Sequence, residues 1–151
     1  MNFEQREEVF GRALKMYRLG LLRDAAREFG RLIEDGSTDP RHLSYYGLLI
    51  AVGEGKVQKG LKLCEQAVED VRYDSEMYLN LAKLHFRTGR PSRAKDVLLQ
   101  ALKIDPKNPA LIRQIARVNP RANPMLPFLN RRHPLNKYLG LARARLFLTV
   151  A

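Results

Sequence analysis

Cysteine is almost absent from this chain of 151 residues, and long apolar runs are absent altogether. The one cysteine, Cys64, cannot form a disulfide within the chain, so we expect a reducing, cytoplasmic setting. A membrane-spanning helix needs roughly 18 consecutive apolar residues, and no stretch approaches that length. The N-terminal stretch MNFEQREEVF carries acidic residues and no apolar segment, so we expect no secretory signal there.

Acidic residues are missing from the last part of the chain. The formal net charge is +11, but it is unevenly distributed. Residues 1–40 hold 7 basic and 8 acidic side chains, residues 75–108 hold 7 and 3, and residues 109–151 hold 8 and none. The sequence therefore predicts a nearly neutral body with a basic C-terminal third.

Recognisable catalytic and metal-binding motifs are also missing. The three histidines (His42, His85 and His133) have no metal-ligand spacing with one another or with Cys64. The stretch GEGK at 53–56 lacks the earlier glycine and the following Ser or Thr that a phosphate-binding loop requires. Cys64 occupies an apolar position and is expected to be a small buried hydrophobe. We therefore predict a protein that is not an enzyme and has no catalytic residues, cofactor or metal.

What the chain does contain is an internal repeat of 34 to 35 residues. Gly20, Gly55 and Gly89 recur at this interval. The same shift aligns three small residues, namely Ala25, Gly60 and Ala94. Each glycine separates two stretches of helical periodicity, so each unit is predicted to be a pair of helices. The predicted units are residues 6–40, 41–74 and 75–108.

The third unit has the strongest local signals. Apolar residues recur at helical spacing from Ser75 to Arg87, which predicts a helix there. Gly89 suits the left-handed conformation that follows a helix, and Pro91 suits the first turn of the next one. The Asn-Pro start at Pro109 predicts a further amphipathic helix over 109–118 that caps the array.

The third unit resembles the tetratricopeptide repeat (TPR) family. The residues that carry the resemblance are Tyr78, Leu81, Ala82, His85, Gly89, Ala94, Leu98, Ala101 and Pro106. The resemblance implies an all-α, TPR-like solenoid of helical hairpins over 6–118, in which stacked neighbours bury a continuous core. The size of the chain and its build from three units are similar to those of the TPR chaperones of type III secretion.

The resemblance also implies a concave groove, formed by the first helix of each unit, that binds extended peptides or helices. The groove residues carried over by position are Phe10, Leu14, Tyr17, Tyr45, Tyr46, Leu49, Leu79, Asn80, Lys83 and Phe86. Only Asn80 and Lys83 could serve in the carboxylate clamp with which some family members grip chaperone C-termini. An apolar peptide or helix is therefore the expected ligand. For Tyr45 and Leu79, a position in the core between helices is as compatible with the sequence as a position in the groove.

The tail after the cap has two parts. Four prolines exclude a helix across 119–136, and residues 137–151 are predicted to form a C-terminal helix. The basic residues of the whole tail, 119–151, are Arg121, Arg131, Arg132, Lys137, Arg143 and Arg145. Packing in its own groove or in that of a second copy is the favoured interpretation of the tail, since it is rich in apolar residues. Contact with an anionic membrane or with nucleic acid remains open.

Taken together, these features predict a non-enzymatic protein–protein interaction module, either a TPR adaptor or a chaperone-like protein. Its expected partner is a protein or peptide, and self-association through the tail is a further expectation. The alternative is a basic protein that acts at an anionic membrane surface or on nucleic acid through its C-terminal tail.

Overall fold

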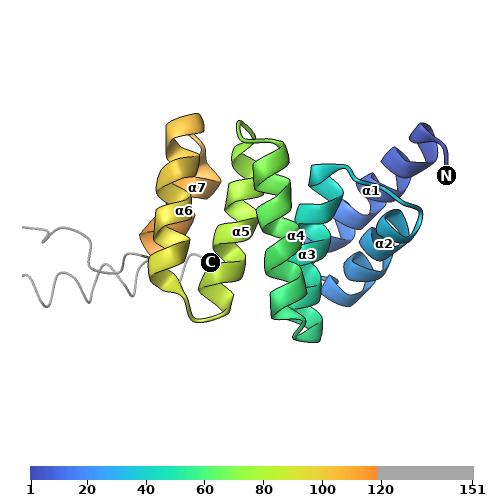
Figure 1. Ribbon diagram of the computed structural model, residues 1–151, viewed down its shortest axis with the longest axis horizontal. Helices are drawn as coiled ribbons and strands as arrows, with labels where there is room; N and C mark the ends of the chain where they lie inside the picture. Colours follow the sequence, from blue (N-terminus) through green and yellow to red (C-terminus); the bar gives the residue numbers. More distant parts are fainter. Residues whose placement is uncertain (119–151) are drawn as a thin grey trace, which may run out of the picture. The chain divides into compact units, whose positions relative to one another are not determined.

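The structure is a computed structural model that describes residues 1–118, and every regular element in that range is an α-helix (Figure 1). The helices are α1 (Phe3–Arg18), α2 (Leu22–Glu34), α3 (Pro40–Glu54), α4 (Val57–Asp70), α5 (Ser75–Arg87), α6 (Pro91–Ile104) and α7 (Pro109–Val118). The predicted all-α class is confirmed.

Several of the predictions above concern residues outside the described range. These are the proline-rich segment 119–136, the helix at 137–151, the six basic tail residues, and self-association through the tail. The alternative function at a membrane or on nucleic acid depends on the same residues. The division of the chain into units at 6–40, 41–74 and 75–108, with a cap at 109–118, also stays a prediction.

Local sequence signals set the helix ends. The Asp39 carboxylate accepts a hydrogen bond of 2.8 Å from the Arg41 amide, and Pro40 occupies the first turn of α3. Gly55 ends that helix in the left-handed region with φ 71°. The GEGK stretch is therefore the end of α3 and the turn at 55–56 that leads to α4. The predicted helix from Ser75 to Arg87 is present as α5, with the next helix starting at Pro91.

The helices form consecutive pairs that stack along the chain. α1 packs on α2, α3 on α4 and α5 on α6, and each pair contacts the next one. Figure 1 shows this row from α1 (blue) to α7 (orange). α7 packs against α6 and α5. No pair buries its apolar face alone, so the core runs continuously through the array.

The helices α3 and α4 approach each other closely at two glycines, Gly47 and Gly60. A Cβ added to Gly47 would lie 2.7 Å from the Gly60 carbonyl oxygen. A Cβ added to Gly60 would lie 2.7 Å from the Ala51 Cβ and closer still to the Gly47 carbonyl oxygen. The equivalent small residues of the other pairs, Ala25 and Ala94, are fully buried. The repeated small residue is therefore required by helix–helix distance.

Aromatic rings fill the core between the first two pairs. Phe29 and Tyr45 stack with ring centroids 5.3 Å apart and an angle of 5° between the rings. Phe10 and Tyr17 meet Tyr45 edge-on from α1. The Tyr45 hydroxyl donates a hydrogen bond to Glu76, so this side chain also connects α3 to α5. Such edge and stacked geometries add to the stabilisation from buried area.

Candidate functional site

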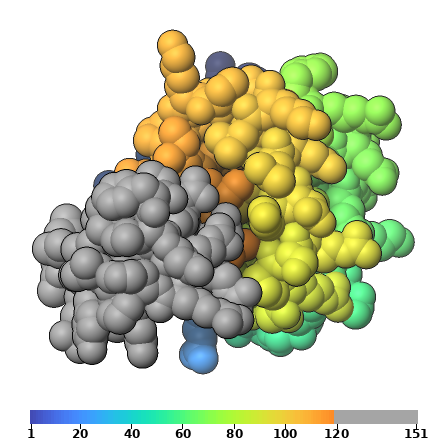
Figure 2. Space-filling model, turned by 90° about the vertical axis from the view of Figure 1, so that its left-hand side faces the viewer, coloured from blue at the N-terminus to red at the C-terminus, as the bar shows by residue number. Residues whose placement is uncertain are grey.

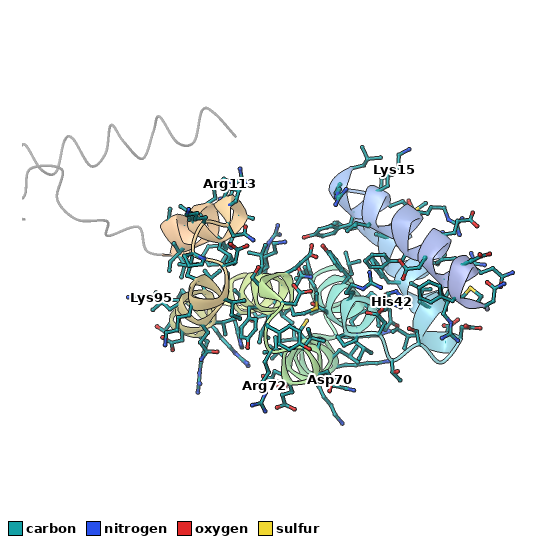
Figure 3. All side chains as sticks on the ribbon, turned by 90° about the horizontal axis from the view of Figure 1, so that it is seen from above. Lys15, His42, Asp70, Arg72, Lys95 and Arg113 are labelled. Carbon is teal, nitrogen blue, oxygen red and sulfur yellow. The ribbon has the colours of Figure 1, made fainter. Side chains whose placement is uncertain are left out.

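A pocket of about 430 Å³ lies where α1, α3, α5 and α7 end. Its lining residues are Tyr17, Leu22, Leu48, Leu49, Val52, Lys83, Phe86, Arg87, Gln114 and Arg117. Figure 3 shows α1 and α7 on the same side of the array, with α3 and α5 between them. The pocket therefore opens on the face that the first helices of the pairs present. Its volume falls in the range of roughly 300–1,000 Å³ that is usual for ligand sites.

Lys83 crosses this pocket and ties α5 to α1. Its ammonium donates hydrogen bonds to the Tyr17 hydroxyl at 3.1 Å and to the side-chain oxygen Oδ1 of Asn80 at 3.3 Å. The same nitrogen lies 5.4 Å from the centre of the Tyr17 ring, within cation–π range. An ammonium has three donors, so one remains for a ligand. Lys83 is thus held in place and still able to bind.

The predicted groove residues differ widely in exposure. Phe86 is exposed (39%), Phe10, Leu14, Tyr17, Tyr46 and Lys83 are half-buried, and Tyr45, Leu49, Leu79 and Asn80 are buried. The structure brings four of them together in the pocket, namely Tyr17, Leu49, Lys83 and Phe86. Their role in binding stays a prediction.

Two of the predicted residues have clear structural contacts elsewhere. The Asn80 side chain is fully buried and donates to the Ser44 hydroxyl at 3.2 Å, which joins α5 to α3. Tyr46 lies on a different surface, where its ring faces Gly30 of α2. The Asn80 side-chain carbonyl oxygen accepts a hydrogen bond from the Lys83 ammonium, and Asn80 itself does not line the pocket.

Six pocket residues were missed by sequence reasoning. They are Leu22, Leu48, Val52, Arg87, Gln114 and Arg117. Arg87 could have been found, since it follows Lys83 by four residues and therefore shares its helix face. Gln114 and Arg117 could not have been found in this way, because the sequence predicts a capping helix at 109–118 but not which of its faces meets the pocket. The pocket is consequently more basic than the sequence analysis predicted.

A second pocket, of about 540 Å³, surrounds Tyr46 between α2 and the turn after α3. Four of its lining residues are basic, and three of these, Arg27, Arg31 and Lys56, are in ion pairs. Arg27 pairs with Asp24 at 3.3 Å, and Lys56 pairs with Glu54 at 2.6 Å. This surface has no cluster of available charges, so we give it no binding role.

The carboxylates of Glu7 and Asp39 approach a ring nitrogen of His42, with all three ligand atoms within 4.8 Å. Arg41 already supplies a positive charge here, since one guanidinium nitrogen lies 2.9 Å from Glu7 and 2.8 Å from Asp39. The hydrogen bond to Asp39 raises the pKa of Arg41 further, and burial lowers the pKa of His42. The group is a structural ion-pair network that joins α1 to the start of α3.

Cys64 and His85 are packed side chains. Cys64 is fully buried, its thiol donates to the Ser44 carbonyl oxygen at 3.3 Å, and burial raises its pKa to about 12. A thiol with so high a pKa is a poor nucleophile. His85 is also buried, and burial lowers its pKa.

Within residues 1–118, no helix is both long and apolar enough to cross a membrane.

Comparison with known proteins identifies the repeat. The family model described as tetratricopeptide repeat matches residues 51–117. The TPR repeat-containing protein YpiA of Bacillus subtilis (strain 168) is 28% identical over 100 residues, which is 65% of this chain. The chain spans only 23% of the length of YpiA, so the activity of the whole relative does not transfer to it.

Solved structures agree on the fold. TTC0263, a thermophilic TPR protein of Thermus thermophilus, aligns with a TM-score of 0.66 at 19% identity, over 76% of this chain and 64% of that one. The first TPR of Spaghetti (RPAP3), bound to an HSP90 peptide, gives 0.63 at 13% identity, over 79% and 94%. PcrH of Pseudomonas aeruginosa, with the chaperone binding region of PopD, gives 0.60 at 18% identity, over 79% and 89%. The family match over 51–117 and these solved structures show that the three helical pairs have the fold of tetratricopeptide repeats.

Proposed function

We propose that this protein is an interaction module that binds an extended peptide or a helix in the pocket between α1, α3, α5 and α7. The observation that carries the proposal is the pocket itself. It combines an apolar floor of Leu48, Leu49 and Val52 with two accessible aromatic rings, Tyr17 and Phe86. A few side chains that become buried at the centre of an interface commonly carry most of its binding energy.

Proteins of the same fold support a peptide partner. RPAP3 TPR domains have been solved with HSP90 and HSP70 peptides, and PcrH with the chaperone binding regions of PopD and PopB. These proteins are between 13% and 18% identical to this chain, so they support the mode of binding and not the partner. An adaptor or chaperone-like role in a cytoplasmic setting is part of the proposal. The free, buried Cys64 thiol suits a reducing compartment.

The test begins with selection of a random peptide display library on the full chain. Binding of a selected peptide is then measured by fluorescence anisotropy for Tyr17→Ala and Phe86→Ala. We expect each to weaken binding by about 2 kcal/mol, as at an aromatic hot spot. The matched control is Tyr73→Ala, because Tyr73 is 81% exposed and does not line the pocket.

Stability is measured in parallel. Tyr17→Ala and Phe86→Ala should lower the free energy of unfolding less than Leu98→Ala, because Leu98 is fully buried. The proposal fails if no peptide is selected, or if the pocket variants bind as tightly as Tyr73→Ala.

A further inference from the structure

The last described helix, α7, has the contacts of a first helix that lacks its partner. α5, the first helix of its pair, packs on α4 and α3, and α7 packs on α6 and α5 in the same order. In each complete pair, the first helix also packs against the helix that follows it. α7 is the last helix within residues 1–118, so it has no such partner in that range. Its position is therefore that of the first helix of a fourth unit.

Two exposed residues of α7 mark the face that a partner helix would bury. A shift by the repeat interval of 34 residues aligns Ile112 with Tyr78 and Ala116 with Ala82. Tyr78 and Ala82 are 8% and 0% exposed, because they belong to a core cluster that includes the buried residues of α6. Ile112 is 49% exposed, and Ala116 is exposed as well. Figure 2 views the array from this end, where α6 (yellow) and α7 (orange) reach the surface.

The other end of the array is finished differently. α1 exposes one apolar side chain, Phe3, at its start, and every later exposed residue through Arg18 is polar, charged or glycine. The terminal units of a repeat array need a polar outer face for solubility. Beyond its first residue, α1 meets this requirement. The apolar positions left open on α7 favour a further element that covers them.

The second helices of the three pairs show which sequence such an element would have. Each of them buries residues at positions i, i+4 and i+7, where a small residue comes first and a larger one second. The buried sets are Ala25, Phe29 and Leu32 in α2, Gly60, Cys64 and Ala67 in α4, and Ala94, Leu98 and Ala101 in α6.

The same pattern occurs in the sequence that follows α7. Ala144, Leu148 and Ala151 have the spacing and the residue types of the set in α6. Their alignment with α6 also places Arg145 at the position of Lys95, which is exposed. A second occurrence, which begins at Ala122, is interrupted by two prolines and cannot form a helix. Residues 144–151 are thus the match that remains.

We propose that a helix containing residues 144–151 is the second helix of a fourth unit and packs, within the same chain, on Ile112 and Ala116 of α7. The chain itself is the occupant because the matching residues are tethered to α7, which gives them a high effective concentration at this face. The connection over 119–143 is long, but the entropy cost of closing a loop grows only with the logarithm of its length. The inference concerns a face outside the pocket and does not depend on peptide binding.

The experiment measures hydrogen–deuterium exchange of the α7 amides in the full chain. Leucine and alanine are both strong helix formers, so Ala116→Leu leaves an open surface unaffected but overpacks a docked helix. Leu148→Ser removes the large side chain of the docking helix. Each variant should speed exchange in α7 by about tenfold, because the protection that docking adds is lost. The double variant should be no more than about twofold faster than either one, since both changes break the same contact.

Two control variants accompany these. Gln66→Leu adds a leucine to an exposed position of α4, and Arg145→Gln alters the tail at the position that aligns with exposed Lys95. Exchange in α7 should change less than about twofold in both. Exchange in α1 and α2, followed in the same samples, shows whether the array remains folded. If a variant speeds exchange there too, the smaller changes Ala116→Met and Leu148→Ala decide instead.

The outcomes are distinct. Unchanged exchange in α7 for both Ala116→Leu and Leu148→Ser would overturn the inference. An effect of Ala116→Leu alone would mean that another segment covers α7, and an effect of Leu148→Ser alone that the tail docks elsewhere; either overturns it. Protection of α7 that falls on tenfold dilution would assign this face to a second copy and would overturn it as well. None of these measurements involves a peptide, so the proposed function is tested separately.

Discussion

The two halves of the array are built on the same repeat and stabilised differently. Residues 1–56 hold every ion pair found within residues 1–118, and some of them connect separate helices, such as Arg12 to Glu28 at 2.8 Å. Residues 57–118 rely on buried apolar side chains, among them Leu98 and Leu111. The repeat therefore requires small and apolar residues at set positions, whereas the pairing of its surface charges differs between the two halves.

The largest effect is expected where the two halves meet, at the contact between α3 and α4. Gly60→Ala should destabilise the protein by about 1–3 kcal/mol, and Gly60→Leu by more, because an added Cβ meets Gly47 and Ala51. Gly11→Ala is the matched control, since an added Cβ on Gly11 meets nothing within 4 Å. That change should stabilise α1 by about 0.5–1 kcal/mol. Chemical denaturation measures both, and equal effects would contradict the close approach.

The next effect tests the ion-pair network of the first half. Arg41→Met leaves Glu7 and Asp39 close together without their shared guanidinium. All three side chains are between 29% and 39% exposed, so the expected loss is only about 1–2 kcal/mol. Arg113→Met in the second half should change stability by less than about 0.5 kcal/mol, because Arg113 has no ion pair within residues 1–118. Thermal melts at low and high salt measure the difference, and salt should narrow it.

Much of the fold could be predicted because its signals are local. Asp39-Pro40 and the glycines that end helices fix element boundaries from adjacent residues alone. The recurrence of Ala25, Gly60 and Ala94 indicated the places where paired helices touch. Helix ends and close contacts thus depend on short-range chemistry that a single sequence displays.

The candidate site was less predictable, because it depends on which way each helix turns. Tyr45 and Tyr46 are adjacent, and neighbouring side chains on a helix point about 100° apart, so both could not face one groove. Tyr45 lies in the core, and Tyr46 lies beside Gly30. Arg117 reaches the pocket only because α7 packs on α5 and α6, a tertiary contact that no local signal reveals.

A smaller effect distinguishes paired from unpaired surface cations. Arg12→Gln should lower the free energy of unfolding by a small but measurable amount, since Arg12 donates two hydrogen bonds to Glu28. Lys103→Gln in the second half should have no measurable cost, because no acid within residues 1–118 pairs with it. Denaturant titrations at low salt measure both. A loss at Lys103 as large as that at Arg12 would erase the contrast between the halves.

The smallest effect is a dependence on pH that both halves share. Burial lowers the pKa of His42 and of His85, so the folded protein holds both rings neutral where the unfolded chain, with a histidine pKa of about 6.5, takes up protons. The stability that depends on these neutral rings is therefore fully present above a pH of about 6.5 and falls as the pH drops below it.

The charged side chains near each histidine ring also influence its pKa, and they differ between the two halves. His42 is near Asp39 and Glu7, which favour its protonation, and near Arg41 and Arg6, which oppose it; His85 is near Glu65, Arg90 and Arg93. His85→Phe keeps an aromatic ring and removes the titration, so its melting temperature should fall less between about pH 7 and pH 5.5 than that of the wild type. His42→Phe should do the same at a cost in stability, because it also loses the 2.7 Å hydrogen bond to Ser37. Carboxylates titrate mostly below this range, so slopes unchanged by both substitutions would mean that neither ring is held neutral by burial.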